Sequence, residues 1–298
     1  MKKSLLVVLS LAFVFVLAAC GSSSGDGDVT SLTMGFVPSQ DADKIADTVE
    51  PLQERLSEIL DVDIDARVMT DFVGLVEAMR TGQVDIGFLP PFGFVQAEER
   101  ANVEVILKAV RDGETSYRAQ YSIRNDADLE HIQSLEDLVN EEGIRWAYAD
   151  PTSASGFLFP ASQLLGLGVE DLDAHFSQLV VGGHDTALIA LLNNDADIAT
   201  TYEDARDRVE QDYADVKERV RVLGFTDPIP NDTISVREGL SDEWTQKIKE
   251  AFLSFNDDEE MIQVMSDVYN WTGIAEAKSE DYEIVRETYR NFEEQLAE

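Results

Sequence analysis

Cysteine, histidine and cationic side chains are scarce in this sequence of 298 residues. It contains 1 Cys, 3 His and 23 Lys and Arg, against 59 Asp and Glu, so its formal net charge is −36. One cysteine cannot form an intramolecular disulfide, and so few sulfur and imidazole ligands predict no zinc site. This acidity disfavours nucleic acid and anionic membrane surfaces as partners. An anionic ligand would need short-range donors in a desolvated cleft.

Motifs that mark common enzymes and cofactor sites are also missing. The sequence has no Walker motif, dinucleotide fingerprint or EF-hand loop, and no Gly-x-Ser-x-Gly elbow between a strand and a helix. A calcium site made only of carboxylates stays open. Ser153 or Ser155 with His184 and an aspartate offers the groups of a hydrolytic triad, but a serine in the first turn of a helix is better suited to donate to an anion. We therefore expect a binding protein without cofactor or metal, not an enzyme.

The N-terminus carries an export signal. Two lysines precede an apolar run over residues 5–17, which is too short for a transmembrane helix. The small residues before Cys20 resemble the cleavage site of bacterial lipoproteins, in which the cysteine is lipidated. This resemblance implies a signal peptide over residues 1–19, a flexible tether over residues 20–30, and an anchor on the outer face of the cytoplasmic membrane. The alternative is an ordinary secretory peptide with an incidental cysteine.

Apolar runs of strand length alternate with helical patterns along the chain, which predicts an α/β fold. The expected strands lie at residues 32–37, 62–69, 84–88, 103–110, 117–124, 144–149, 177–181, 196–200 and 231–237. The expected helices include 42–60, 72–80, 185–192, 242–255, 259–269 and 282–295. Only helices are expected after the last strand. The stretch from Phe72 aligns without a gap with the stretch from His184, so both residues are expected at equivalent helix N-termini.

This order of elements predicts two lobes joined by two chain crossings. The first lobe is expected over residues 31–115 and the second over 116–227, with residues 228–298 returning to the first lobe. The crossings, which act as a hinge, are expected near residues 112–120 and 224–232. Ligands of open α/β sheets bind outside the carboxyl ends of strands, so loops from both lobes should converge on one cleft.

The stretch Asp150-Pro151-Thr152-Ser153-Ala154-Ser155-Gly156 has the composition of an anion-binding turn. It lies between an expected strand and an expected helix. There the first N–H groups of the helix have no intrahelical partner, and the helix dipole is positive. Serine and threonine add hydroxyl donors, and Gly156 allows a close approach of the backbone. Taken by itself, the stretch also fits an ordinary Ser or Thr N-cap.

Four stretches together resemble one protein family. They are Asp150 to Phe157, Gly183-His184-Asp185, Val84-Asp85-Ile86-Gly87 and Ile229-Pro230-Asn231-Asp232. In them the chain is similar to the PhnD-type substrate-binding lipoproteins of phosphonate, phosphite and phosphate ABC transporters. The resemblance covers nearly the whole chain after the signal peptide. It implies a type II periplasmic-binding fold, in which two lobes with mostly parallel sheets flanked by helices close on a ligand.

The resemblance also implies which residues hold the oxyanion. In this family, backbone N–H and hydroxyl groups of the serine turn act together with a histidine. Here those roles fall on Ser153, the backbone of Ala154, Ser155 and His184. Many members have threonine at the place of Ala154, so one hydroxyl is missing. A histidine that only caps its helix is the alternative for His184.

Other positions are expected to surround the rest of the ligand. Phe72 and Leu89 stand where the family often has tyrosine, and Tyr202 is a candidate to replace a lost hydroxyl. Asp204 and Asp232 match the carboxylates that hold the ammonium group of aminoalkyl phosphonates. The alternatives are that Phe72 and Leu89 belong to the core, and that Asp204 lies in the solvated first turn of a helix.

We therefore expect the extracellular, lipid-anchored and monomeric receptor of an ABC importer. It would capture a small phosphorus oxyanion, with a phosphonate as the first choice, by hinge closure, and present it to permease subunits in the membrane. Two alternatives stay open. One is a receptor of the same fold for a sulfonate, nitrate or another organic anion. The other is a lipoprotein sensor.

Overall fold

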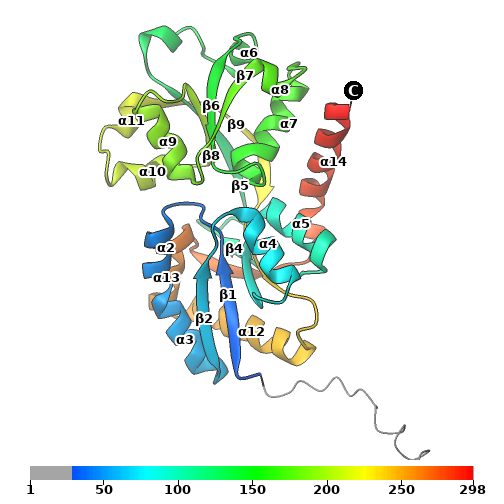
Figure 1. Cartoon of the computed structure of the whole chain (residues 1–298). Helices are drawn as coiled ribbons and strands as arrows, with labels where there is room; N and C mark the ends of the chain where they lie inside the picture. The colour runs from blue at the N-terminus through cyan, green and yellow to red at the C-terminus, as the bar shows by residue number, and fades with distance from the viewer. Residues whose placement is uncertain (1–28, 298) are drawn as a thin grey trace, which may run out of the picture.

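The computed structural model describes residues 29–297, which form two lobes stacked end to end (Figure 1). The expected signal peptide, the expected lipidation at Cys20 and most of the expected tether lie outside the described residues. Within residues 29–297, no helix combines the length and the apolarity that crossing a membrane requires.

The lower lobe in Figure 1 is built on a six-stranded sheet with the order β11-β4-β10-β3-β1-β2. Its strands are β1 (Ser31–Phe36), β2 (Asp63–Val68), β3 (Ile86–Leu89), β4 (Glu104–Val110), β10 (Thr233–Val236) and β11 (Gly273–Glu276). β1 runs parallel to β2 and β3, whereas β10 and β11 are antiparallel to their neighbours. Because two strands come from the C-terminal part of the chain, the chain returns to this lobe after building the other.

The upper lobe contains a five-stranded sheet with the order β7-β6-β8-β5-β9. Its strands are β5 (Ser116–Arg124), β6 (Ile144–Tyr148), β7 (Phe176–Val180), β8 (Ile198–Tyr202) and β9 (Val220–Pro230). β6 is parallel to β7 and β8, and β5 is antiparallel to β8 and β9. The expected two-lobed α/β fold is confirmed. Both sheets are mixed. The first contains the antiparallel strands β10 and β11, and in the second the chain enters along β5 and leaves along the adjacent β9 in the opposite direction.

Helices cover both faces of each sheet. In the first lobe α2, α3, α12 and α13 enclose one core, and α4 and α5 cover the other face. In the second lobe α9, α10 and α11 lie on one face, and the π-helical turn η2 with α7 lies on the other. The bounds are α2 (Ala42–Thr48), α3 (Glu50–Leu60), α4 (Phe72–Arg80), α5 (Pro91–Ala101), α6 (Leu135–Leu138), η2 (Ala154–Leu158), α7 (Phe159–Gly166), α8 (Leu172–His175), α9 (His184–Leu192), α10 (Ala205–Glu210), α11 (Val216–Arg219), α12 (Asp242–Ser254), α13 (Glu259–Tyr269) and α14 (Glu283–Ala297).

The structure departs from the expected elements in three places. One is β9, an edge strand of the second sheet, which lies where no strand was expected. The helix expected over residues 42–60 is divided into α2 and α3, with Pro51 in the first turn of α3. Proline has no N–H to donate and fits the start of a helix better than its interior. The expectation of helices alone after residue 237 was wrong, because β11 adds to the edge of the first sheet beside β4.

Hydrogen bonds of Asn231 join the two segments that cross between the lobes. Its side-chain amide donates to the carbonyl oxygens of Ala109 at 3.0 Å and Glu114 at 2.9 Å, and its backbone N–H donates to Thr115 O at 3.0 Å. The hydroxyl of Tyr282 donates to the Asn231 carbonyl oxygen at 2.9 Å. The outgoing and returning segments are therefore held side by side, as a two-stranded hinge requires.

The last helix spans both lobes, whereas the whole tail was expected on the first lobe. Figure 1 shows α14 rising from the lower lobe along α7 of the upper lobe. Tyr289 packs on Phe92 of α5 with ring centres 4.9 Å apart, and Phe292 meets Phe157 edge-on at 5.7 Å. The apolar face of α14 thus bridges the lobes on the side of the serine turn.

Candidate ligand-binding site

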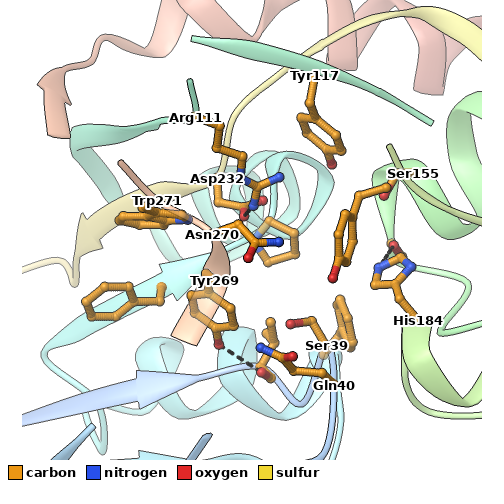
Figure 2. Close-up of a pocket in the computed structure, with 16 residues that line it drawn as sticks. Ser39, Gln40, Arg111, Tyr117, Ser155, His184, Asp232, Tyr269, Asn270 and Trp271 are labelled. Atoms are coloured by element: carbon orange, nitrogen blue, oxygen red, sulfur yellow. Dashed lines mark hydrogen bonds and ion pairs between the residues drawn. The ribbon is translucent and has the colours of Figure 1, made fainter. Parts of the chain in front are cut away.

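A largely enclosed cavity lies between the two lobes, at the carboxyl ends of strands from both sheets (Figure 2). Its volume is about 40 Å³, on a scale where one water molecule needs roughly 10–15 Å³. That space suits a ligand of a few heavy atoms. The cavity is lined by Val37, Ser39, Gln40, Phe72, Phe88, Pro90, Arg111, Tyr117, Ser153, Ser155, His184, Tyr202, Asp232, Tyr269, Asn270 and Trp271.

The serine turn presents free backbone donors to this cavity. The N–H groups of Phe157 and Leu158 both donate to the Ser153 carbonyl, at 3.0 and 3.1 Å, and Gly156 N–H donates to Ser153 Oγ at 3.0 Å. These bonds leave the N–H groups of Ala154 and Ser155 without a partner among the described residues. A π-helical opening of this kind is frequent at functional sites. Two free N–H groups at a helix N-terminus form an anion site.

Hydrogen bonds from nearby side chains hold the turn in place. Asp150 Oδ1 accepts from Thr152 N–H at 2.8 Å and from its hydroxyl at 2.6 Å. The Thr200 hydroxyl donates to the Gly156 carbonyl and accepts from Trp146 Nε1–H at 2.8 Å. The backbone donors are therefore fixed before any ligand arrives.

His184 opens α9 opposite the serine turn. Its Nε2 lies 3.5 Å from Ser153 Oγ, and its ring meets the Tyr202 ring edge-on at 5.1 Å. Burial, helped by the positive charge of Arg111, lowers the His184 pKa to about 3. The imidazole is therefore neutral near pH 7. It can offer one N–H donor and one acceptor, and its buried Nδ1 has no partner among the described residues.

Arg111 and Asp232 form an ion pair in the cavity wall. Arg111 Nη2 lies 2.5 Å from Asp232 Oδ2, and both side chains are less than one-fifth exposed (17% and 18%). The guanidinium also lies 5.0 Å from the centre of the Tyr117 ring and 5.8 Å from that of Tyr202. Burial raises the pKa of Asp232, and Arg111 opposes that rise. The pair brings no net charge to the cavity.

Two tyrosine hydroxyls complete the polar wall. Burial raises the pKa of both Tyr117 and Tyr202, so both phenols keep their protons near neutral pH and remain donors. Tyr117 follows the first crossing on β5 and Tyr202 ends β8, so both belong to the second lobe.

The first lobe supplies an aromatic wall. Phe72, the first residue of α4, lines the cavity. Phe88, Tyr269 and Trp271 line it as well. Leu89 does not line the cavity. Successive side chains of a strand point to opposite faces, so Phe88 faces the cavity while Leu89 is fully buried in the core with α4 and α5. Leu89 therefore belongs to the hydrophobic core, which was the alternative interpretation. Phe72 belongs to the core and also lines the cavity.

Asp204 also lies apart from the cavity. It is exposed, and it precedes α10 in a left-handed conformation with φ 62°. Together with Glu203 and Asp207 it lines an open acidic groove outside the cavity. The alternative of a solvated first turn therefore fits Asp204, which does not line the cavity, although the groove and the cavity share Arg111, Tyr117 and Tyr202. Six of the predicted residues do line the cavity: Ser153, Ser155, His184, Phe72, Tyr202 and Asp232. Ala154 lies between the two serines and is not itself among the lining residues.

Sequence reasoning did not identify several lining residues. Arg111 ends an expected strand just before a crossing, and that position was a usable signal. Tyr269 ends α13, and Asn270 and Trp271 follow it. These three residues reach the cavity only because the tail folds back on the first lobe. No local pattern in the sequence marks that return.

The lobes are closed on each other. The His184 backbone N–H donates to the Ser39 carbonyl of the first lobe at 2.9 Å. At the rim, Arg208 of α10 donates to the carbonyl oxygens of Ser266 at 2.6 Å and Asp267 at 2.8 Å, in the last turn of α13. A cation at a helix C-terminus also interacts favourably with the helix dipole.

Comparison with known proteins agrees with this architecture. Residues 34–282 match the family described as the periplasmic substrate-binding protein of phosphonate ABC transporters. The chain belongs to this family. The substrate-binding family is not an enzyme family, and its members work as components of ABC importers on the periplasmic or extracellular side. The role that follows from membership is capture of a phosphonate-type anion for import.

Individual family members differ in the ligand that they are named for. The chain is 27% identical to the phosphate-import protein PhnD of Mycolicibacterium smegmatis, over 78% of this chain and 74% of the relative. It is 25% identical to the phosphonates-binding periplasmic protein of Escherichia coli, over 84% of this chain and 74% of that one. The structure of Prochlorococcus marinus PhnD1 with methylphosphonate has the same fold, with a TM-score of 0.78 at 20% identity, covering 89% of this chain and 98% of that one.

Proposed function

We propose that this protein captures a small phosphorus oxyanion without a cationic substituent, such as a short alkylphosphonate. One observation carries the proposal. The cavity lies between the serine turn, where the N–H groups of Ala154 and Ser155 have no partner among the described residues, and an aromatic wall, and the only carboxylate among the described lining residues is already paired with Arg111. Donors for an oxyanion and apolar surface for a substituent are present. The charge of Asp232 is balanced by Arg111, so the described lining residues offer no uncompensated negative charge to an ammonium group.

Each wall has its own task in this proposal. The N–H groups of Ala154 and Ser155, the Ser155 hydroxyl and the His184 ring hold oxygens of the anion. Ser153 stiffens the turn through its bond with Gly156 N–H. The alkyl group lies against the aromatic residues of the first lobe.

The donor set is large enough for useful affinity. A hydrogen bond to a charged oxygen contributes about 1.5–3 kcal/mol. Roughly four such bonds, less the cost of closure, are compatible with micromolar binding or tighter. Because the donors are neutral and fixed, this attraction acts at short range despite the chain's formal net charge of −36.

The setting in the cell is part of the same proposal. Cys20 carries a lipid anchor on the outer face of the cytoplasmic membrane, and the protein works as a monomer. The closed form presents surfaces of both lobes to the permease subunits. Support comes from the residues before Cys20 and from the family to which the chain belongs.

Calorimetry with four ligands tests the proposed ligand class. Methylphosphonate, phosphite and phosphate are small phosphorus oxyanions, and 2-aminoethylphosphonate adds an ammonium group. We expect at least one of the first three to bind in the micromolar range or tighter, and 2-aminoethylphosphonate to bind at least tenfold more weakly than methylphosphonate. Tighter binding of the aminoalkyl ligand, or no binding of any of the four, contradicts the proposal.

A further inference from the structure

The carboxylate in the cavity wall imposes a requirement on the ligand. Asp232 is the only acidic side chain among the described residues that line the cavity. Arg111 donates to its Oδ2 at 2.5 Å, and the indole of Trp271 lies beside the carboxylate without completing a hydrogen bond to it. An ionised carboxylate has acceptors and no donor. Asp232 therefore keeps an acceptor in a cavity that is otherwise suited to anions.

The two sides of the cavity make opposite demands on a bound oxyanion. On the serine-turn side, the N–H groups of Ala154 and Ser155 donate, and they require ligand oxygens with lone pairs. On the Asp232 side, an oxygen without a proton would meet another acceptor in a closed space. A polar contact that stays unmade in a desolvated site is costly, whereas an O–H donor turns the same contact into a charge-assisted hydrogen bond.

The charges around the cavity also favour a ligand that carries one negative charge and keeps a proton. The Arg111 charge is balanced by Asp232, and the guanidinium is held between the rings of Tyr117 and Tyr202. His184 is neutral near pH 7, because burial lowers its pKa to about 3. The cavity therefore has no uncompensated positive charge for the second negative charge of a dianion. A singly charged ligand fits it better.

We propose that Asp232 accepts a hydrogen bond from a protonated oxygen of the ligand, so that the site selects R–PO₂(OH)⁻ over anions of equal charge that have no proton. This inference rests on the proposed function, since it takes a phosphorus oxyanion as the ligand. Asp232 is then the residue that separates phosphonates from sulfonates. A sulfonate has nearly the same shape and the same single charge, but all its oxygens are acceptors.

Methylphosphonate and methanesulfonate are the matched ligands for the test. Both are titrated near pH 6 into the wild-type protein and into two variants, Asp232→Asn and Asp204→Asn. Each variant removes one negative charge. Asp204 lies outside the cavity at a left-handed φ of 62°, which asparagine adopts readily, so Asp204→Asn controls for the change in charge. In Asp232→Asn, the amide that replaces the carboxylate would offer N–H donors to a sulfonate oxygen.

We expect the wild-type protein to bind methylphosphonate about 100-fold more tightly than methanesulfonate, since sites built to pair with a ligand O–H reject analogues that lack it. Asp232→Asn should lower that ratio at least tenfold, mainly through tighter binding of methanesulfonate, while Asp204→Asn leaves it within about twofold.

Equal affinities for the two ligands in the wild-type protein overturn the inference, and this comparison decides the matter even if Asp232→Asn does not fold. An unchanged ratio in a folded Asp232→Asn protein also overturns it. If no phosphorus oxyanion binds the wild-type protein, the proposed function fails as well, which is a distinguishable result.

Discussion

Ser153 and Ser155 lie two residues apart, but their side chains have different tasks. Ser153 Oγ accepts a hydrogen bond from Gly156 N–H at 3.0 Å and so closes the turn. Ser155 is buried in the cavity wall beside Tyr117, and in the proposed function its hydroxyl contacts the ligand. Composition alone identified both residues as a donor-rich turn. It could not separate the supporting serine from the contacting one, because that depends on which N–H groups the turn leaves free.

Ser155→Ala should weaken methylphosphonate binding about tenfold to 100-fold, because one hydrogen bond to a charged oxygen is lost. Calorimetry measures this change. Ser177→Ala is the control, since Ser177 is an exposed serine on β7 of the same lobe. Equal affinities of the two variants would show that the Ser155 hydroxyl does not touch the ligand.

His184 predicts a pH dependence of stability. Its pKa is lowered to about 3 by burial, against about 6.5 in an unfolded chain. Between these values the unfolded state binds a proton that the folded state does not, so the free energy of unfolding falls as pH decreases through this window. The contribution is at most about 1.4 kcal/mol per pH unit. Urea unfolding of His184→Asn should show a shallower slope between pH 6 and 4, and identical slopes would contradict the assignment.

The residue types in the sequence predicted the serine-turn side of the cavity better than the side that holds Phe72 and Asp232. Leu89 was expected in the wall because the family often has tyrosine at its position, but strand alternation turns its side chain into the core. Asp232 does line the cavity, yet its role changes because Arg111 lies beside it. A pairing between residues 121 positions apart depends on how the crossings meet, and sequence periodicity does not contain that information.

At the scale of elements, the serine turn with α7 is the functional unit of the second lobe. A Cβ atom on Gly156 would lie 2.9 Å from Ser153 Oγ and 3.0 Å from Ser153 Cβ. Neither distance leaves room for a methyl group. Glycine is therefore required here by the packing against the capping serine. The expected close approach of the Gly156 backbone to an anion stays a prediction.

Gly156→Ala should displace the Ser153 cap, lower the melting temperature by several degrees and weaken ligand binding at least tenfold. Gly166→Ala is the matched control at the end of α7, where an added Cβ has no atom within 4 Å, and it should preserve or raise stability. Differential scanning fluorimetry and calorimetry on both variants check this. Similar results for the two would contradict the geometry of the turn.

Periodic elements were predictable and edge elements were not. α4 and α9 begin at Phe72 and His184 as expected from the internal alignment, because each has a local helical pattern and a helix-starting loop. β11 is only four residues long, and it is a strand because β4 offers it an unpaired edge. A short segment of this kind takes its structure from a distant partner, which propensity cannot reveal.

At the scale of the whole molecule, contacts between the lobes set the balance between open and closed forms. Arg208 of the second lobe binds the last carbonyl oxygens of α13 in the first lobe. Lys44 and Asp212 form an exposed ion pair across the same rim at 3.3 Å, which contributes little by comparison. Any contact made only in the closed form raises the apparent affinity for a ligand that is bound in that form.

Arg208→Ala should therefore reduce methylphosphonate affinity roughly tenfold although Arg208 does not line the cavity. Arg206→Ala is the control, because Arg206 bonds to Val220 O within the second lobe at 3.0 Å. Small-angle scattering should also show a larger radius of gyration for Arg208→Ala than for wild type at the same ligand concentration. Unchanged affinity and radius would mean that Arg208 does not hold the lobes together.

The central claim concerns where the anion lies, and a crystal structure with methylphosphonate measures that directly. We predict phosphonate oxygens within hydrogen-bond distance of the Ala154 and Ser155 N–H groups, with the methyl group against Phe72 and one oxygen facing Asp232. A phosphonate held in the outer groove beside Asp204, or one bound in the cavity without touching the serine turn, would contradict it.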